Sequence, residues 1–462
     1  MNKCLLCCWL LLIALLRPAP IAQAQSEDDP PTYIVQAGDT LSLIALRFGI
    51  TTGDLISANN INDPNAINVG TKLIIPGLSG VHGVLVGKTI GFGETLRTVS
   101  ITQNMSVDAF VRVNRITSPY ELYTGNNLIV TQVEDPNQRS AEVLEPQTTL
   151  LENAAIHQTS AWLLTETNLY QYTWQPLPGD LIFYPGSVPV ANQSPFSPYL
   201  QDISIAPLPL KEGDTAVLKI TPGRQVTISG SFGGEKLIFH QIADGQFAAL
   251  FGIKLDEIGL SPLYISLVDD TGQNFELSQA VLIGSGGFRE DPPLVVDPTT
   301  LDPVVIEEED ALVDNLTRQI SADKLWETPF QYPSDAAGEC IRAGFGNSRT
   351  YNDGYTSKHT GVDFGVCAPN LNIYAPAPGR VVFAGPLVIR GNATIIDHGW
   401  GVFSGYWHQS EILVQVGEQV ESGKLIGIIG NTGRSTGPHL HWEIRLNGIP
   451  VNPLSWVQNT YP

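Results

Sequence analysis

The chain has 462 residues, which at roughly 100 to 200 residues per domain predicts three to five modules. It carries a formal net charge of −21, 43 % apolar and only 15 % charged residues, together with 44 glycines and 33 prolines. This composition argues against wholesale disorder and favours β-rich, turn-rich modules. Because phosphate backbones are bound by clusters of Lys and Arg, the acidic balance also argues against a nucleic-acid partner.

Residues 1–24 have the pattern of a secretory signal peptide. Lys3 gives a basic start, an apolar run extends from Leu5 to Leu16, and Ala22 to Ala24 form a small-x-small cleavage site. A transmembrane anchor is the alternative, but the run is shorter than the ~20 residues that a helix needs to cross a bilayer. We therefore expect an extracytoplasmic protein, secreted or periplasmic, without a stable membrane anchor after cleavage.

Three copies of one small module follow, at residues 31–77, 86–132 and 141–186. In the first copy we expect a strand at 33–35 and a helix capped by Asp39 or Thr40. A second helix begins near Thr52, and a strand at 72–75 closes the module. The apolar residues of the first helix recur at helical spacing: Leu41, Ile44, Ala45 and Phe48.

The first copy, YIVQAGDTLSLIALRFGITTGDLISANNINDPNAINVGTKLIIPG, resembles the LysM module. That family has a small α+β (βααβ) fold and binds N-acetylglucosamine-containing glycans such as peptidoglycan or chitin. The second copy has Thr131 in place of the final Pro and the third has Gln147 in place of the opening Gly, so these two are divergent. The resemblance implies a glycan groove at four residues, which could equally serve as caps and turns: Gly38, Asp39, Thr40 and Ile67.

The middle of the chain carries fewer signals. In residues 200–286, short alternating runs separated by Gly, Asp and Pro turns predict an all-β sandwich, which resembles an immunoglobulin-like spacer module. Residues 287–325 are rich in acids, Pro and Val. They are expected to form a solvated acidic linker with a short helix over 311–325.

The C-terminal residues concentrate the histidines. Five of the eight fall after residue 358, which predicts metal or acid–base chemistry: His359, His398, His408, His439 and His441. The run from His439 to Leu446 alternates, so on a strand His439, His441, Glu443 and Arg445 share one face, with the two histidines ~7 Å apart. His398 is expected to be structural.

A second pair, His359 and Asp363, lies within HTGVDFG. On a straight strand these residues would be ~13 Å apart, so Gly361 is expected to bend the chain. Two imidazoles and one carboxylate with an open fourth position match a catalytic zinc site. His408, on a candidate strand over 402–408, is the remaining acid–base candidate.

With HxxxD, Tyr-x-His and HxH in this order, residues 326–462 resemble the lysostaphin-type (LytM) zinc metallopeptidases. That family has a mainly antiparallel β fold and cleaves peptide bonds in peptidoglycan. The resemblance implies one Zn²⁺ per catalytic domain, held by His359, Asp363 and His441. His408 and His439 would then transfer protons and polarise the scissile carbonyl.

The resemblance also implies substrate contacts in the stretch before HTGVDFG, where a structural loop is the alternative: Arg349, Tyr351 and Asn352. Residues 433–437 match GxSxG, but a nucleophile elbow must turn into a helix, whereas Pro438 and a strand follow. After signal cleavage Cys340 and Cys367 remain. We expect a disulfide between them in an oxidising compartment, with free thiols or a zinc-ligating Cys367 as the alternatives.

The sequence therefore predicts a multidomain cell-wall hydrolase. Glycan-binding repeats would hold a zinc endopeptidase near peptidoglycan and so raise its effective substrate concentration. The alternative, from a different functional class, is a catalytically silent or autoinhibited peptidoglycan-binding protein that activates another hydrolase. The intact ligand set argues against the silent protein.

Overall fold

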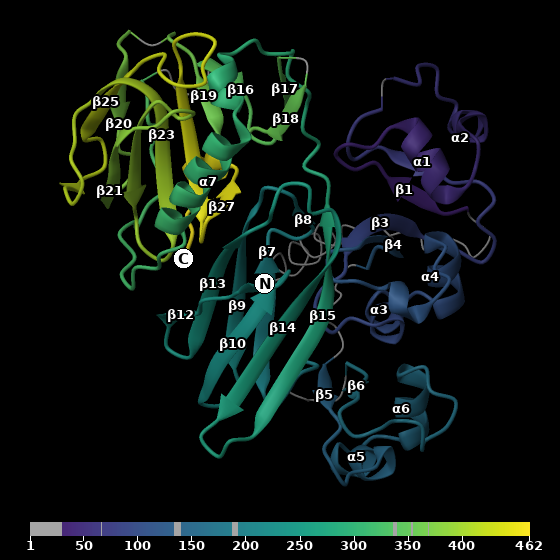
Figure 1. The fold of residues 1–462 in the computed structure, drawn as a ribbon. Helices are drawn as coiled ribbons and strands as arrows, with labels where there is room; N and C mark the ends of the chain where they lie inside the picture. The colour runs from purple at the N-terminus through teal and green to yellow at the C-terminus, as the bar shows by residue number, and fades with distance from the viewer. Residues whose placement is uncertain are drawn as a thin grey trace, which may run out of the picture. The chain divides into compact units, whose positions relative to one another are not determined.

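The computed structural model describes residues 30–65, 67–133, 140–186, 193–335, 340–352, 354–367 and 369–462 (Figure 1). The predicted signal peptide lies outside these described residues. The chain divides into two compact units, residues 1–88, 100–117 and 129–136 forming one and the remainder the other. Within the described residues, no single helix is long and apolar enough to span a membrane. The helices α1 (Leu41–Phe48) and α2 (Thr52–Asn59) together reach that length and composition, but with a bend of 106° between them.

The first repeat has the expected βααβ order: β1 (Thr32–Ile34), α1 (Leu41–Phe48), α2 (Thr52–Asn59) and β2 (Lys72–Ile74). The two strands are antiparallel, with Tyr33 opposite Leu73. The Thr40 side chain caps α1 by accepting a hydrogen bond from the Leu43 N–H. The four apolar residues predicted for the inner face of α1 are all buried.

The other two repeats have the same order of elements. The second consists of β3 (Val84–Thr89), α3 (Leu96–Thr102), α4 (Val107–Asn114), a 3₁₀ turn at Pro119–Glu121 and β4 (Asn127–Thr131). The third consists of β5 (Ala141–Val143), α5 (Leu150–Ile156), α6 (Ala161–Thr167) and β6 (Leu181–Phe183). Strands β2, β1, β3 and β4 form one sheet in that order, and β5 pairs with β6.

One asparagine in each repeat explains why the divergent copies keep the fold. The amides of Asn59, Asn114 and Asn168 each donate to a backbone carbonyl of the last strand, at 2.7–2.8 Å, and accept an N–H from the same strand. These bonds tie the second helix to the closing strand. Gln147, which replaces the opening glycine, adopts a left-handed φ of +73° at the cost of some backbone strain.

Residues 200–286 form two sheets, as predicted, in the orders β11-β10-β14-β15-β8 and β12-β13-β9-β7. The strands are β7 (Leu200–Ala206), β8 (Leu210–Lys211), β9 (Thr215–Pro222), β10 (Val226–Phe232), β11 (Glu235–Lys236), β12 (His240–Ala243), β13 (Gln246–Gly252), β14 (Gly259–Asp269) and β15 (Asn274–Gly284). Leu, Ile, Val and Phe side chains of both sheets form one core. Both faces are buried along most of β13 and in the first half of β9.

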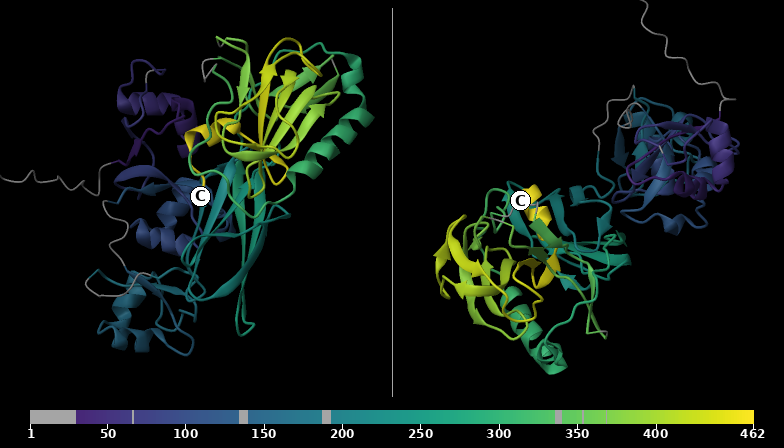
Figure 2. Two further views of the ribbon diagram at one scale, coloured as in Figure 1. Left: turned by 90° about the vertical axis from the view of Figure 1, so that its left-hand side faces the viewer. Right: turned by 90° about the horizontal axis from the view of Figure 1, so that it is seen from above.

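The acidic segment differs from the expected solvated linker. Its helix, α7, extends over Pro303–Thr317 rather than 311–325 and follows a 3₁₀ turn at Pro298–Leu301. Asp302 caps the helix and Pro303 occupies its first position, a combination that favours initiation. The helix lies against the C-terminal domain (Figure 2), where Val313 packs into a cluster with Trp407. The acids were misjudged because one of them, Glu309, is buried.

The C-terminal domain is mainly antiparallel β, as predicted. Strands β16 (Ile341–Ala343), β19 (Val362–Phe364), β26 (Leu440–Leu446), β23 (Val402–Ile412), β22 (Asn392–Asp397), β21 (Gly379–Pro386) and β24 (Gln419–Val420) are neighbours in that order. β25 (Leu425–Ile429) pairs with β23 and β20 (Asn372–Tyr374), and β27 (Ile449–Val451) pairs with β26. A separate hairpin contains β17 (Ser348–Tyr351) and β18 (Tyr355–Lys358), and α8 (Pro453–Gln458) ends the fold.

A disulfide joins Cys340 to Cys367, as the sequence favoured. It links the start of β16 to the chain just after β19, next to the histidine-rich strands. The pairing removes Cys367 from the candidate metal ligands, because a disulfide sulfur is not a thiolate.

Candidate metal centre and active site

The register of three neighbouring strands brings the candidate residues together. Asp363 on β19 is opposite His441 on β26, and Trp407 on β23 is opposite His441 from the other side. His408 follows Trp407 on β23, and a left-handed φ of +65° at His408 interrupts the alternation of the strand. As a result Trp407 and His408, although adjacent in the strand, face the same site. The ring centres of His408 and His439 are 4.8 Å apart.

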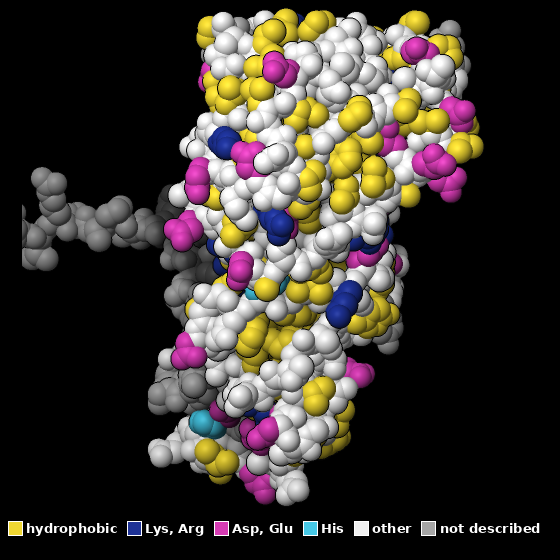
Figure 3. Space-filling model, turned by 60° about the vertical axis from the view of Figure 1, so that its left-hand side comes forward, with side chains coloured by type: hydrophobic (Ala, Val, Ile, Leu, Met, Phe, Trp, Pro, Cys, Tyr) yellow, Lys and Arg dark blue, Asp and Glu magenta, His cyan; other side chains and the backbone are white. Residues whose placement is uncertain are grey.

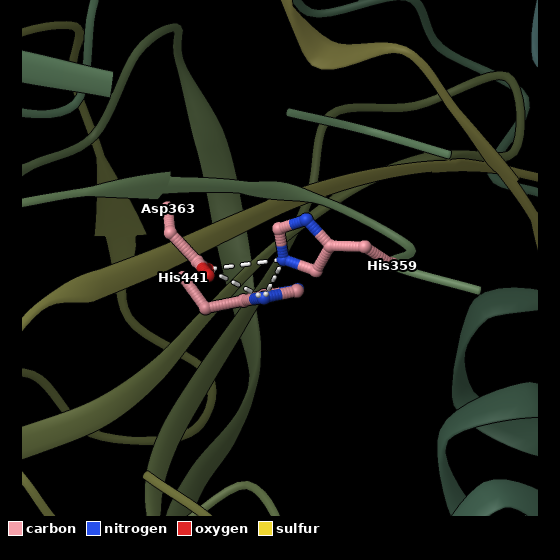
Figure 4. Close-up of side chains that lie close together, drawn as sticks. All are labelled: His359, Asp363 and His441. Carbon is pink, nitrogen blue, oxygen red and sulfur yellow. Dashed lines mark hydrogen bonds and ion pairs between the residues drawn. The ribbon is translucent and has the colours of Figure 1, made fainter. Parts of the chain in front are cut away.

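His359, Asp363 and His441 point toward one another and are buried (Figure 4). His359 Nε2 lies 3.0 Å from His441 Nδ1 and 3.0 Å from Asp363 Oδ1, and His441 Nδ1 lies 3.1 Å from the same oxygen. The other ring nitrogen of His359 donates to the Gly344 carbonyl at 2.7 Å, which fixes its proton on Nδ1. Nε2 of His359 therefore presents a lone pair to the centre of the cluster.

This donor set fits a zinc ion. Two imidazole nitrogens and one carboxylate oxygen converge within 4.8 Å of one another, which is the three-ligand pattern of catalytic zinc sites. His441 Nδ1 faces the cluster and offers a lone pair there when the proton is on Nε2, which is buried and has no hydrogen-bond partner among the described residues. The histidines also hold the pKa of Asp363 well below its usual range, although burial alone would raise it. A carboxylate that is ionised at neutral pH is the form that binds metal.

Gly361 explains how two residues only four apart in the chain can share one site. β18 ends at Lys358 and β19 begins at Val362, so the expected interruption between His359 and Asp363 is present. A Cβ atom at Gly361 would lie 2.4 Å from the Trp442 carbonyl oxygen and 2.5 Å from His441 Nε2. Only glycine permits this close approach.

Arg349 fixes the second oxygen of Asp363. Its guanidinium bonds Asp363 Oδ2 at 2.5 Å and Asp291 Oδ2, from the acidic segment, at 2.9 Å. Burial would lower the pKa of Arg349, but its contact with Asp363 raises it overall. The side chain therefore orients Asp363 so that Oδ1 alone faces the two histidines, a supporting role typical of residues behind a metal ligand.

His408 and His439 are each oriented by a bond between Nδ1 and a backbone carbonyl. His408 Nδ1 bonds the Thr432 carbonyl at 2.7 Å, and His439 Nδ1 bonds the Gly437 carbonyl at 2.8 Å. Since these bonds place the protons on Nδ1, each Nε2 is an acceptor. Burial, followed by the neighbouring His439 and His441, lowers the pKa of His408 well below its usual value.

Two grooves adjoin at this site. One contains His359, His408 and His441 in its lining, and the other, of about 380 Å³, contains Asp363 and His439. Part of the wall of the larger groove comes from the acidic segment: Asp291, Pro292, Leu294 and Val296. That segment bridges to β17 in parallel, at Glu290–Ser348 and Leu294–Tyr351.

Of the three residues expected to contact substrate, Arg349 and Tyr351 differ from Asn352 in their surroundings. Arg349 and Tyr351 line both grooves. Both polar atoms of the Asn352 amide are bonded to the backbone of Val296, which gives this side chain a structural contact. Its role toward substrate stays a prediction.

In the first repeat, the residues expected at the glycan groove also make local contacts. Asp39 accepts bonds from the Tyr33 hydroxyl and the Gln36 N–H, Thr40 caps α1, and Gly38 has a φ of +88°. Ile67 is half-buried. These contacts account for their presence as caps and turns, and their role toward glycan stays a prediction.

Sequence reasoning missed several residues at the site. Arg390 and Trp407 line the smaller groove, and Glu309 holds the Arg390 loop from α7. No motif marks Glu309, since it lies in a run of acids. Arg434 was passed over because it belongs to the GxSxG match, in which Ser435 is followed by β26 rather than by a helix.

Comparison with known proteins assigns the C-terminal domain. Residues 357–453 match the model of Peptidase family M23, and residues 33–76 and 89–131 match the model of the LysM domain. The chain contains an M23 peptidase domain preceded by LysM domains. The M23 match includes every candidate metal ligand and both candidate acid–base histidines. The LysM matches comprise the first and second repeats.

Curated relatives match this chain over about 100 residues. The chain is 47 % identical over 98 residues to the DD-carboxypeptidase/endopeptidase Mpg of Neisseria meningitidis, covering 21 % of this chain and 22 % of that protein. It is 42 % identical over 96 residues to the peptidoglycan DD-endopeptidase ShyA of Vibrio cholerae, covering 21 % and 22 %. The chain thus spans about a fifth of the length of these relatives.

Among solved structures, a putative M23 peptidase from Pseudomonas aeruginosa is 27 % identical to the chain, with a TM-score of 0.41. The match covers 55 % of this chain and 96 % of that one.

Proposed function

We propose that this protein is a cell-wall endopeptidase that uses zinc to hydrolyse peptide bonds of peptidoglycan. The observation that carries the proposal is the convergence of three buried donor atoms, from His359, Asp363 and His441, beside two further histidines, His408 and His439, that line the grooves. The names of the M23 relatives, which include DD-endopeptidase, support peptide cross-links as the substrate class.

The roles follow from the contacts of each residue. His359, Asp363 and His441 would hold the ion, and Arg349 would keep Asp363 in place. When bound, zinc supplies Lewis-acid chemistry that polarises the peptide carbonyl and makes a water molecule a better nucleophile. His408 and His439 each offer an Nε2 acceptor, so one would take a proton from the attacking water and the other would bond the substrate or return the proton to the leaving amine.

The remaining parts of the proposal concern targeting. The LysM domains would bind the glycan strands, with Gly38, Asp39, Thr40 and Ile67 at the groove of the first. Residues 141–186 share the order of elements and the tying asparagine, which supports a third LysM domain. We further propose that residues 200–286 are an immunoglobulin-like spacer and that residues 1–24 direct the chain out of the cytoplasm to the cell wall.

The test is the release of new amino groups from purified peptidoglycan by the full-length protein. We expect activity with zinc and none after chelation. His441→Ala should abolish both activity and stoichiometric zinc. His408→Ala and His439→Ala should each retain zinc and lose ~10² to 10⁴ in rate, because proton transfer contributes that much. His82→Ala, an exposed histidine outside the M23 domain, is the matched control and should match the wild type.

The same experiment judges the rival function. A wild-type protein that holds one zinc but releases no amino groups from several peptidoglycan chemistries would exclude the endopeptidase. The binding protein that activates another hydrolase would then be supported if the full chain stimulated a second hydrolase.

A further inference from the structure

Among the described residues, one cation that lines the candidate active-site groove is in no ion pair. Four basic side chains line the smaller groove: Arg349, Lys358, Arg390 and Arg434. Three of them form ion pairs: Arg349 with Asp291 and Asp363, Lys358 with Asp256, and Arg390 with Glu309 and Asp310. Within the described residues, no ion pair is found for Arg434. On the face drawn in Figure 3, by contrast, several Lys and Arg side chains lie beside Asp or Glu side chains.

The Arg434 guanidinium is held in place without being neutralised. Its Cζ lies 4.8 Å from the ring centre of Tyr351 and 5.8 Å from that of Tyr355, so two aromatic faces stabilise the cation. The Arg434 backbone N–H donates to the Ile389 carbonyl at 2.7 Å. The preceding Gly433 has a φ of +75° and no room for a Cβ, which fixes the loop. The guanidinium is therefore preorganised.

One donor of this guanidinium is orphaned. Nη1 of Arg434 is buried and has no hydrogen-bond partner. Leaving a buried charged donor unsatisfied is costly, and the cost disappears when a ligand supplies an acceptor. Arg434 lines both grooves, so a ligand acceptor that reached its guanidinium would remove this cost.

Arg434 is also close to the reacting centre. It lines the smaller groove together with His359, His408 and His441, and the larger groove together with Asp363 and His439. A ligand group bound to Arg434 would therefore belong to the same substrate molecule whose peptide bond meets the histidines.

We propose that Arg434 binds a free carboxylate on the leaving-group side of the scissile peptide bond. This inference rests on the proposed function. The planar guanidinium matches a carboxylate through two parallel hydrogen bonds. In a peptide bond between two D-configured carbon centres, the residue on the carbonyl side has its carboxyl group in the bond itself. The neighbouring free carboxylate is therefore on the residue that supplies the nitrogen. Arg434 would select substrates that carry this group.

Two kinds of substrate contain such a carboxylate. In an uncross-linked stem peptide it is the C-terminus of the last D-residue, and in a cross-link it is on the diamino acid whose side-chain amine forms the bond. The experiment therefore uses two matched pairs. One is a peptide ending in D-Ala-D-Ala and its carboxamide, and the other is a diaminopimelate-cross-linked dimer with that carboxylate free or amidated.

The zinc-loaded full-length protein should prefer the carboxylate member by about 10- to 100-fold in kcat/KM, the worth of a hydrogen bond to a charged group. Arg434→Gln should reduce the preference to about onefold, because its kcat/KM falls more for the carboxylate member than for the amidated member. Arg434→Lys should keep part of it, since lysine keeps the charge but lacks the planar fork. Arg380→Gln, an exposed arginine on β21, should leave the preference unchanged.

A binding arm separates this inference from the proposed function. Calorimetric titration of the chelator-treated protein, which cannot turn over, should show tighter binding of each carboxylate peptide than of its amide, and Arg434→Gln should remove the difference. Equal hydrolysis of both members by an active wild type would overturn the inference and leave the endopeptidase intact. Equal loss toward both members in a folded Arg434→Gln would also overturn it. An inactive protein that still discriminates in titration would overturn only the endopeptidase.

Discussion

Two buried histidines of the M23 domain, His398 and His441, differ in how their ring nitrogens are used. His398 donates or accepts at both, with the Pro378 carbonyl and the Ser404 hydroxyl each 2.7 Å away. His441 directs Nδ1 to the other candidate ligands and leaves Nε2 unpartnered. A histidine satisfied on both sides stabilises a fold, whereas one with a free lone pair can bind a metal.

The first prediction concerns the pH dependence of stability. Burial lowers the pKa of His398 to about 4, although the Pro378 carbonyl and Asp397 each act to raise this pKa. Because the unfolded chain takes up this proton near pH 6.5 and the folded chain only near pH 4, the contribution of neutral His398 is complete above pH 6.5. It is lost as the pH falls toward 4, at a cost of about 3 kcal/mol.

We expect His398→Gln to flatten the fall in the free energy of unfolding between pH 7 and pH 4.5 relative to wild type. Urea titrations measure this free energy at each pH. They are done with a chelator present, so that the site is free of metal throughout. Exposed His82→Ala is the control. Parallel pH profiles for wild type and His398→Gln would contradict the prediction.

The sequence pointed to three residues that the structure brings together, but it did not point to the side chains that hold them. His359, Asp363 and His441 lie in short motifs whose spacing has a chemical reason, and the structure brings all three together. Asp291, which bonds Arg349, is distant in the chain, and its role depends on a backbone path that no local pattern encodes. Residues that act through a neighbour are found only when the neighbour is seen.

At the scale of elements, α7 acts as a brace for the active-site loop. The Glu309 carboxylate accepts bonds from the backbone N–H groups of Ile389 and Arg390, at 2.9 and 3.0 Å, and from the Arg390 guanidinium. The Arg390 carbonyl in turn accepts the His408 N–H at 2.8 Å. A helix outside the M23 match thus supports the unusual backbone of a candidate acid–base residue.

The second prediction follows from this chain of contacts. Glu309→Gln removes the charge that satisfies three donors, so we expect the free energy of unfolding to fall by about 1–3 kcal/mol. The effect on turnover should be on kcat more than on KM, because His408 is displaced while the rest of the groove remains. Glu308→Gln, an exposed neighbour on the same helix, is the matched control. Denaturant titration and steady-state kinetics measure both effects, and equal behaviour of the two variants would refute the bracing role.

Element prediction failed where burial overrode composition. The helices of the first repeat were predicted because caps and apolar spacing coincide, with Thr40 and Leu41 adjacent. The start of α7 was placed too late because Glu307 to Asp310 resemble a solvated run. Only the contact with the loop at 389–390 makes one of these acids a buried side chain, and that contact is tertiary.

At the scale of the whole molecule, the sandwich and the M23 domain share a core. Along β13, Ala249 and Phe251 pack inside the sandwich, whereas Ala248 and Leu250 pack with the M23 core that contains Trp442. The interface is closely fitted, because a Cβ at Gly252 would lie 2.8 Å from Ile449 and Val451 side-chain atoms. Trp456 Nε1 also donates to the Thr215 hydroxyl at 2.9 Å. The sequence predicted a spacer, although the continuous apolar run FAALF of β13 is the pattern of a strand buried on both faces.

The last prediction is that these two parts unfold together. Leu250→Ala, a truncation in the sandwich, should destabilise the M23 domain by about 2–5 kcal/mol, the usual cost of such a cavity. The measurement is calorimetry of the full chain combined with zinc release, which reports the M23 site directly. Leu263→Ala, inside the sandwich core alone, is the control.

If the two parts are one cooperative unit, both variants lower the temperature of zinc release in parallel with the sandwich transition. If they are independent, Leu263→Ala leaves zinc release unchanged and Leu250→Ala shifts it only slightly. Coupling would mean that a fragment beginning near Ser321, which lacks both β13 and α7, is a poor substitute for the full chain. It would expose the side chains that pack against Leu250 and release the loop that Glu309 holds, so its inactivity would report lost support rather than a missing catalytic group.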